Sequence, residues 1–101
     1  MEEMMVDIET TGLHPNRNAM IQLAAVKFDL KENKIGGVFN QCLTIPPNRS
    51  WDEGTREWWL RDKREILQRI LREGRYYRDV LKEFIEFCSD GSYRFWSKPL
   101  S

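Results

Sequence analysis

Residues 6–15 read Val-Asp-Ile-Glu-Thr-Thr-Gly-Leu-His-Pro, and both the fold and the function are inferred outward from this stretch. The span Met4–Ile8 is apolar except for Asp7 and leads into Thr-Thr-Gly, which predicts a strand followed by a turn. Side chains two positions apart in a strand leave from the same face, so the carboxylates of Asp7 and Glu9 are expected side by side. The apolar neighbours then point to the opposite face, into a core.

Two like charges on a strand inside a sheet are costly unless a cation or a proton compensates them. Mg²⁺ and Mn²⁺ prefer oxygen ligands and supply that compensation. A pair of such ions, about 3.5–4 Å apart, can activate a water molecule and stabilise the leaving oxygen in phosphodiester cleavage. That arrangement needs more carboxylates than Asp7 and Glu9. Taken alone, the pair is explained better by an exposed acidic strand end.

Two further strands are predicted after the first one. Met20–Leu30 is apolar on both faces for much of its length, which is typical of a strand well inside a sheet. A polar turn at 31–34 leads to a third strand, Val38–Ile45, and Pro46-Pro47 is expected to end it because proline cannot donate to the ladder. The short connections favour an antiparallel meander.

The composition then changes to that of helices. Residues 50–53, Ser-Trp-Asp-Glu, have the spacing of a capping box and predict the start of a helix that contains 58–60. A second apolar stripe runs over 66–71, and 77–88 carry apolar residues at the spacing of an amphipathic helix. A fourth strand is expected to begin at 93–96. The fold class is therefore α/β, with three strands, helices and then one strand.

Length and composition indicate one small domain with a packed core, since the chain has 101 residues, 41% of them hydrophobic. Sixteen basic residues balance sixteen acidic ones, so any attraction to nucleic acid must be local. The acidic start and the lack of a long apolar run favour a soluble, cytoplasmic protein without a membrane partner. Cys42 and Cys88 lack C-x-x-C spacing and are interpreted as small core side chains.

The run V-D-I-E-T-T-G-L-H-P, followed eight residues after Gly12 by M-I-Q-L-A-A-V-K-F-D, resembles the first motif and second strand of the DEDD (DnaQ-like) 3′–5′ exonucleases. The similarity is best from Val6 to Phe28. It implies a ribonuclease H-like fold, in which an antiparallel three-stranded meander is continued by parallel strands with helices on the faces. The segment T-R-E-W-W-L-R at Thr55–Arg61 and the helix before Trp96 are similar to the phage and bacterial exoribonuclease branch.

The resemblance implies roles for the residues of the first motif. Asp7 and Glu9 would be catalytic and would bind Mg²⁺ or Mn²⁺, with Glu9 also orienting the attacking water. Thr10, Thr11 and Gly12 would hold the 3′-terminal nucleotide, with Gly12 allowing a close approach. Leu13 would wedge against the terminal base.

Two adjacent tryptophans, Trp58 and Trp59, could stack on bases. Helix packing is the default for one of them, so only the exposed one is free to touch a substrate, and Trp59 is assigned that role. An excess of basic residues follows, which could guide a phosphate backbone or simply form a solvated helix face with mixed charge pairs. These residues are Arg61, Lys63, Arg64, Arg69, Arg72, Arg75 and Arg78.

The chain departs from the family pattern after the first motif. The family's site has four acidic residues, the third at the end of the fourth strand and the fourth in a later motif with a His or Tyr base. Here 95–101 resemble the approach to the second motif but end before its Asp, and the last motif is absent. His14, the only histidine, comes too early to replace that base and is expected in an exposed loop. Residues 1–101 are thus predicted to be a single, partial exonuclease domain that lacks the C-terminal half of the fold.

Three hypotheses follow. The first is a metal-dependent 3′–5′ exonuclease, present as an N-terminal fragment, that releases nucleoside monophosphates from a single-stranded DNA or RNA end; the Trp-Trp segment favours RNA. The second is an inactive remnant that acts as a binding or assembly module and forms homo-oligomers through uncovered apolar surface. The third is a nucleic-acid-binding module that uses the basic helices, with Asp7 and Glu9 incidental.

Overall fold

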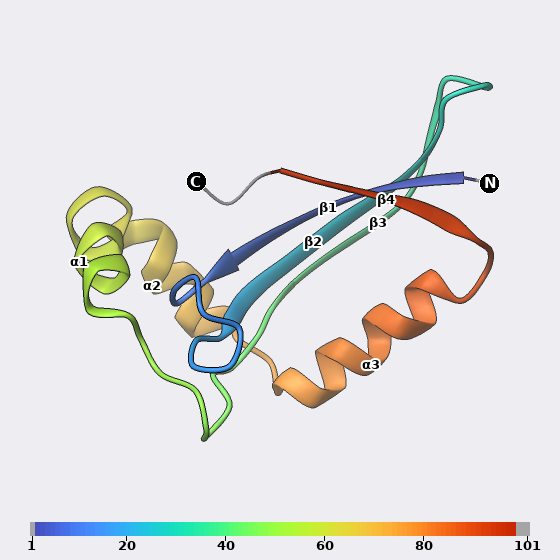
Figure 1. Cartoon of the computed structure of the whole chain (residues 1–101). Coiled ribbons are helices and arrows are strands. Elements are labelled where there is room, and N and C mark those ends of the chain that lie inside the picture. The colour runs from blue at the N-terminus through green and yellow to red at the C-terminus, as the bar shows by residue number, and fades with distance from the viewer. Residues whose placement is uncertain (1, 99–101) are drawn as a thin grey trace.

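The computed structural model describes residues 2–98, which form one four-stranded sheet and three helices (Figure 1). In chain order the elements are β1 (Glu2–Thr10), β2 (Met20–Asp29), β3 (Lys34–Cys42), α1 (Glu53–Asp62), α2 (Arg64–Glu73), α3 (Tyr77–Cys88) and β4 (Tyr93–Ser97). The strand order in the sheet is β3-β2-β1-β4, with β1 and β3 antiparallel to β2 and with β4 parallel to β1. The predicted meander, helices and fourth strand are confirmed.

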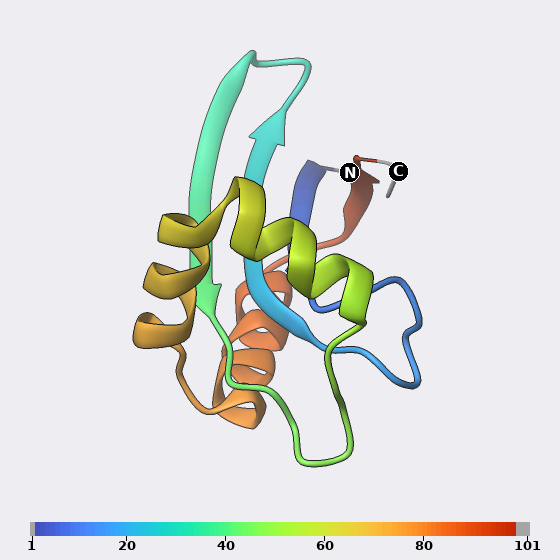
Figure 2. The ribbon, with the colours of Figure 1, turned by 90° about the vertical axis from the view of Figure 1, so that its left-hand side faces the viewer.

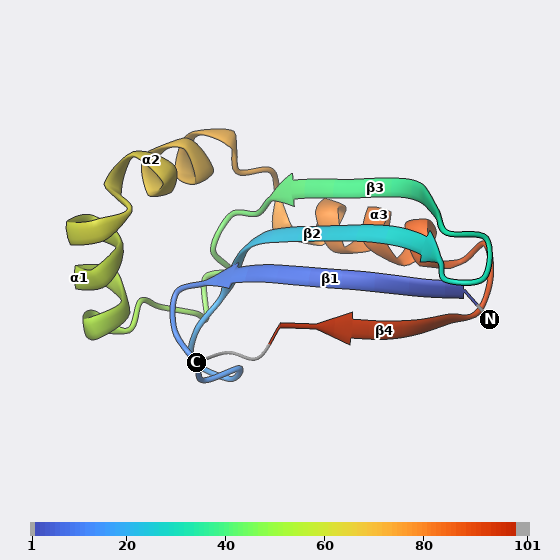
Figure 3. The ribbon, with the colours of Figure 1, turned by 90° about the horizontal axis from the view of Figure 1, so that it is seen from above.

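The helices occupy two places around the sheet. Viewed from above, the strands lie side by side with α3 behind them, and α1 and α2 lie beyond the end where β1 and β3 finish (Figure 3). Seen from that end, α1 and α2 are in front of the strands (Figure 2). Because β4 runs parallel to β1, the chain has to return to the end of the sheet where β1 begins before β4 can pair with β1. Helix α3, which directly precedes β4, makes that return.

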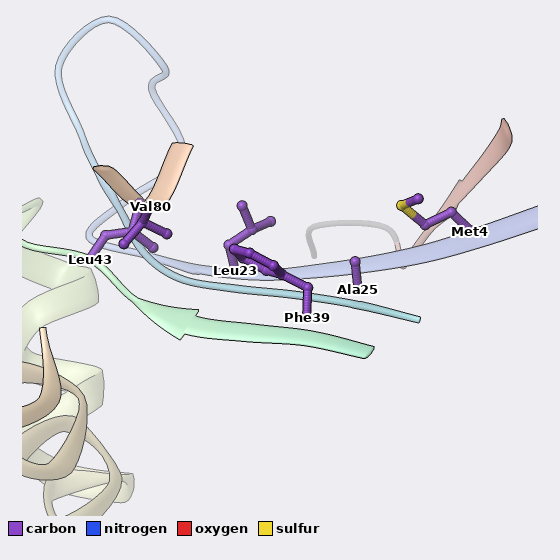
Figure 4. Packing of buried hydrophobic residues seen from close by; sticks show 6 residues of the cluster. All are labelled: Met4, Leu23, Ala25, Phe39, Leu43 and Val80. Carbon is purple, nitrogen blue, oxygen red and sulfur yellow. The ribbon is translucent and has the colours of Figure 1, made fainter. Parts of the chain in front are cut away.

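The larger core lies between α3 and one face of the sheet. The register aligns Val6, Ala25 and Phe39 across three strands, so they share this face. The Phe39 ring packs edge-on against Phe84 of α3, with 5.4 Å between ring centroids. The buried members are Met4, Leu23, Ala25, Phe39, Leu43 and Val80 (Figure 4). A second cluster of Ile21, Cys42, Trp59, Leu67 and Ile70 joins α1 and α2 to the ends of β2 and β3.

The opposite face of the sheet is open. The register places Trp96, Met5, Val26 and Val38 in one row across all four strands, and Trp96, Met5 and Val38 are exposed. β2 lies between β1 and β3, as its apolar sequence predicts. Its second apolar face, however, is only half-buried in the part of the chain that the structure describes.

Two strand boundaries differ from the prediction. β3 spans Lys34–Cys42 instead of Val38–Ile45, because the hairpin with β2 continues through the pairs Phe28–Ile35 and Asp29–Lys34 to a tight turn. Asn33 closes that turn with a φ of 52°, a left-handed conformation that asparagine tolerates. At the other end the chain leaves the ladder before the two prolines, at a bridge to the segment after α2. β1 is longer than Met4–Ile8 in both directions.

The predicted capping box at 50–53 is wrong. Asp52, not Ser50, is the N-cap of α1, and its Oδ2 accepts hydrogen bonds from the Thr55 amide and hydroxyl at 2.9 Å each. The carbonyl of Ser50 instead accepts a hydrogen bond from the hydroxyl of Thr11, 39 positions earlier in the chain. A local spacing rule misplaced the cap because a long-range contact uses Ser50.

Polar contacts hold β4 against the rest of the sheet. Arg94 donates hydrogen bonds to the carboxylate of Glu3, the shortest of them 2.6 Å, and these bonds keep the pKa of Glu3 below its usual value although desolvation opposes them. Lys27 of β2 lies 3.0 Å from Asp90, which also accepts a hydrogen bond from the hydroxyl of Tyr93. The turn between α3 and β4 is therefore fixed to the sheet.

No helix in residues 2–98 is long and apolar enough to cross a membrane. Both cysteines are free thiols, Cys42 buried and Cys88 half-buried, and burial raises the pKa of each. Each contacts one of the two hydrophobic clusters, as predicted for small core side chains.

Ile70→Ala should destabilise the domain by about 2–5 kcal/mol, because Ile70 is fully buried between α2 and the sheet and its truncation leaves a cavity. Ile85→Ala, at an exposed position of α3, should change the free energy of unfolding by about 0.5 kcal/mol or less. Urea denaturation followed by circular dichroism measures both. Equal effects would contradict the placement of α2.

Candidate active site

Asp7 and Glu9 lie near the end of β1 on the open face of the sheet. Across the ladder they pair with Ala24 and Gln22 of β2. Directly after Glu9 the register shifts by one residue, so that Thr10 pairs with Met20. Such a bulge bends the strand and redirects the side chains that follow it.

The two carboxylates differ in their surroundings. Glu9 is half-buried, and this desolvation raises its pKa, with a further increase from the charge of Asp7. Lys98 and Lys63 act in the opposite direction. Asp7 is exposed, so the expectation of an anionic pair enclosed within the sheet holds only for Glu9. Asp7 lies on the open face of the sheet, whereas Glu9 lines the cavity beside α1.

The donor set at this point suits a hard divalent cation. Asp7 and Glu9 offer carboxylate oxygens from one face, and a cation between them would offset the repulsion that raises the pKa of Glu9. Within residues 2–98 there is no group of three or more His, Cys, Asp or Glu side chains placed to hold a metal. The pair therefore fits Mg²⁺ or Mn²⁺ but supplies fewer ligands than a two-metal site needs.

Thr11 fixes the loop that follows β1. Its side chain is 0% exposed; its hydroxyl donates to the Ser50 carbonyl and accepts from the Ala19 amide, both at 2.8 Å. Its own amide and carbonyl bond to Ala19 and Asp52. Both the donor and the acceptor capacity of the hydroxyl are therefore used inside the protein, and contact between Thr11 and a nucleotide stays a prediction.

Gly12 is also buried within the protein. A Cβ at this position would collide with Oδ1 of Asn18 and lie 2.8 Å from Cβ of Asp52, so the absence of a side chain lets the loop pack against 50–52. Internal packing accounts for a glycine at this position, and close approach of a substrate to Gly12 stays a prediction. Asn18 bonds to Ser50 and His14 at 3.0 Å in the same network.

The two tryptophans of α1 have the opposite roles to those predicted. Trp59 is 3% exposed, and its indole N–H donates to the Thr10 carbonyl at 3.2 Å. Trp58 is 40% exposed, and its ring packs edge-on against Trp59 with 5.1 Å between centroids. The sequence pair did indicate that one tryptophan packs and one stays accessible, but the choice of Trp59 was wrong.

A cavity of about 420 Å³ opens between the end of β1 and α1. It brings together the half-buried carboxylate of Glu9, the accessible ring of Trp58, the exposed side chain of Leu13 and the polar first turn of α1. Thr10 and Leu13, both predicted to contact a nucleotide, line it, whereas Asp52 and Thr55 were not predicted. The complete lining is Ile8, Glu9, Thr10, Leu13, Asp52, Gly54, Thr55, Trp58 and Trp59.

Two of the basic residues between α1 and α3 form ion pairs with acidic neighbours. Arg61 pairs with Asp62 at 3.1 Å and Arg75 with Glu83 at 2.6 Å. This pattern fits the solvated helix face that was the alternative to a phosphate-guiding surface. His14 is exposed in the loop after β1, where it was expected.

The sequence profile described as "3'-5' exoribonuclease Rv2179c-like domain" matches residues 2–99. The chain belongs to this family. Among curated proteins, no significant match to the sequence was found. Family membership places the domain among the exonucleases and is consistent with the DEDD resemblance of its first motif.

Solved structures of nucleases have the same ribonuclease H-like fold. A full-length 3′-exonuclease matches 95% of this chain with a TM-score of 0.64 and 16% identity. The nuclease domain of 3′hExo, described as a DEDDh family member bound to rAMP, matches 97% with a TM-score of 0.63 and 15% identity. The cell-death related nuclease CRN-4 matches 94% with a TM-score of 0.58 and 19% identity. The chain spans 45%, 52% and 34% of their respective lengths.

Thr11→Val should destabilise the domain by about 1–3 kcal/mol, because it keeps the side-chain volume but leaves the buried amide of Ala19 without its acceptor. Thr11→Ser keeps the hydroxyl and should retain most of the stability. Thermal and urea unfolding of both variants provide the comparison. A valine variant as stable as the native chain would show that the hydroxyl network is dispensable.

Proposed function

We propose that this domain provides the first metal-binding strand and the terminal-nucleotide pocket of a metal-dependent 3′–5′ exonuclease that acts on single-stranded RNA. The observation that carries the proposal is the single cavity lined by both Glu9 and Trp58. Its volume of about 420 Å³ lies in the range of small-molecule sites. A carboxylate next to an accessible aromatic wall suits a nucleotide whose phosphate lies near the carboxylate and whose base lies against the ring.

The residues of the chain divide the work of such a site. Asp7 and Glu9 would hold Mg²⁺ or Mn²⁺, which when bound lowers the pKa of a coordinated water and stabilises negative charge at phosphate. Glu9 lines the cavity, so its carboxylate would also be placed to orient the attacking water. Leu13 and Trp58 would contact the terminal base from two sides of the cavity.

We propose RNA and not DNA as the substrate because the family description names exoribonucleases. Among the similar structures, the 3′hExo nuclease domain is bound to rAMP, and a further 3′-exonuclease is described as recognising the 3′ end of a histone mRNA stem-loop. Those statements concern the neighbours, and for this chain they support the proposal only through the shared fold.

Isothermal titration with MnCl₂ tests the metal site directly. The native chain should bind Mn²⁺, and Asp7→Asn or Glu9→Gln should weaken binding at least about tenfold, because each removes one of two charged ligands. Asp79→Asn, which removes an exposed carboxylate of α3, is the matched control and should bind like the native chain. Equal Mn²⁺ binding by all four proteins, or none by any, would refute the metal site.

The pH dependence of that binding has a defined sign. The pKa of Glu9 is raised, so protons compete with the metal for its carboxylate at a higher pH than they would for an ordinary glutamate. Mn²⁺ affinity should therefore fall as the pH is lowered through this raised pKa, and recover above it. Without metal, the same shift means that ionised Glu9 costs stability above its folded pKa, so Glu9→Gln should melt at a slightly higher temperature at pH 7.

Nuclease activity of the 101 residues alone is expected to be low, because the chain contains only the first acidic motif. Release of nucleoside monophosphates from a short single-stranded RNA, abolished by Asp7→Asn, would show that the domain is active by itself. Mn²⁺ binding without cleavage would instead favour the alternative of a nuclease-fold module that binds or assembles without catalysis.

Self-association is proposed for the same chain, through the open face of the sheet. The row formed by Trp96, Met5, Val26 and Val38 crosses all four strands and is partly exposed, and such apolar faces favour burial against a partner. The proposed partner is a second copy that packs against this apolar row with its own.

Val38→Glu should shift the protein towards monomer, because it places a charge in the apolar row. Ile85→Glu introduces the same charge at a position of similar exposure, 69% against 66%, but on α3, and it should leave the association unchanged. Light scattering coupled to size-exclusion chromatography, over a range of concentrations, measures the mass. A native chain that stays monomeric at every concentration would contradict the proposal.

A further inference from the structure

Two carboxylates line the cavity between β1 and α1 that is proposed to bind the nucleotide. One belongs to Glu9 of β1 and the other to Asp52 at the start of α1. Leu13 and Trp58 line the same cavity and offer apolar surface for a base. The proposed metal site accounts for Glu9 but gives Asp52 no task beyond capping the helix. A second acidic side chain in a pocket for an anionic ligand requires an explanation, because it repels phosphate.

Asp52 uses only one of its two oxygens inside the protein. Oδ2 accepts both hydrogen bonds from Thr55, from the amide and from the hydroxyl. Asp52 is exposed, and within residues 2–98 no hydrogen bond reaches Oδ1 of its carboxylate, so this oxygen is open to solvent or to a ligand. The Thr55 bonds also hold the pKa of Asp52 below its usual range, so the side chain is an ionised acceptor at neutral pH.

Charge determines which part of a nucleotide can lie beside Asp52. The positive end of the α1 dipole is already compensated by this carboxylate, so a phosphate gains little there and is repelled. The phosphate is therefore directed to the Glu9 end, where the proposed cation and the field of Lys63 and Lys98 favour it. The group next to Asp52 must be an uncharged hydrogen-bond donor. With the base ring against Trp58 and Leu13, the donors left between the base and the phosphate are the ribose hydroxyls.

We infer that Asp52 is a specificity-determining residue, whose Oδ1 accepts a hydrogen bond from the 2′-hydroxyl of the 3′-terminal nucleotide. DNA has no donor at that carbon, so the contact selects RNA. The inference rests on the proposed function of the same cavity and adds the chemical basis of its substrate choice. A hydrogen bond to a charged acceptor corresponds to a preference of about tenfold in dissociation constant.

The test is nucleotide binding to the whole 101-residue chain in MnCl₂, followed by quenching of intrinsic tryptophan fluorescence. The probes are adenosine and uridine 5′-monophosphates and their 2′-deoxy forms. The native chain should bind each ribonucleotide about tenfold more tightly than its deoxy form. The preference should be the same for adenine and uracil, because it concerns the sugar; a preference confined to adenine would assign the contact to the base amine and overturn the inference.

Two variants separate this contact from the capping role of Asp52. Serine and asparagine are both good N-cap residues, so Asp52→Ser and Asp52→Asn should keep α1 folded, which circular dichroism checks. The serine side chain of Asp52→Ser is too short to reach the sugar, so the preference of this variant for ribonucleotides should fall to within about twofold. Asp52→Asn keeps the reach but loses the charge, so its preference should lie between that of the serine variant and that of the native chain. A serine variant with the full native preference would overturn the inference.

The outcomes also distinguish this inference from the proposed function. Equal binding of ribo- and deoxyribonucleotides by the native chain refutes the role of Asp52 and leaves the nucleotide pocket standing. No binding of any nucleotide by the native chain refutes the pocket itself.

Discussion

The structure depends on how the end of β1 is held in place. Thr11 is fully buried, and its hydroxyl, amide and carbonyl all bond to segments distant in the sequence, at Ala19, Ser50 and Asp52. The indole of Trp59 adds a bond to the Thr10 carbonyl. Loss of the bond from the Ala19 amide to the Thr11 hydroxyl would leave a buried donor unsatisfied, and the other bonds join the loop and the strand end to the segment before α1 and to Trp59. That arrangement places Glu9 and Asp52 around a common cavity.

Electrostatics explain why this end of the sheet needs further groups. Glu9 is desolvated next to Asp7, and only the lysines at 63 and 98 counteract the resulting rise in its pKa. Two carboxylates attract a divalent cation but do not complete the coordination of two ions. The open face beside them carries an apolar row across the sheet. The chain spans about half the length of the solved nucleases it matches, or less.

The structure places several residues of the first motif in surroundings that the interpretation of the sequence did not foresee. Thr11 and Gly12 were expected to touch the nucleotide, and both instead join the motif to 50–52. Asp52 and Thr55, which were not expected near a ligand, line the cavity. The choice between Trp58 and Trp59 failed because the two side chains are adjacent in the helix, and the sequence does not show which of them faces the sheet. The hydrogen bond that fixes Trp59 inside joins its indole to the Thr10 carbonyl, 49 positions away.

The sequence by itself determined the elements and their order. The short apolar run at Met4–Ile8, the longer one of β2 and the helical spacing of 77–88 are local patterns, and backbone geometry converts them into strands and a helix. It also determined that Asp7 and Glu9 share a face, since that follows from the two-residue repeat of a strand. Only the tertiary structure decided which motif residues are internal, which tryptophan is accessible and which carboxylates meet at one cavity. Those outcomes depend on contacts between segments far apart in the chain, as between Thr11 and Ser50, 39 positions apart, and no local pattern encodes such a contact.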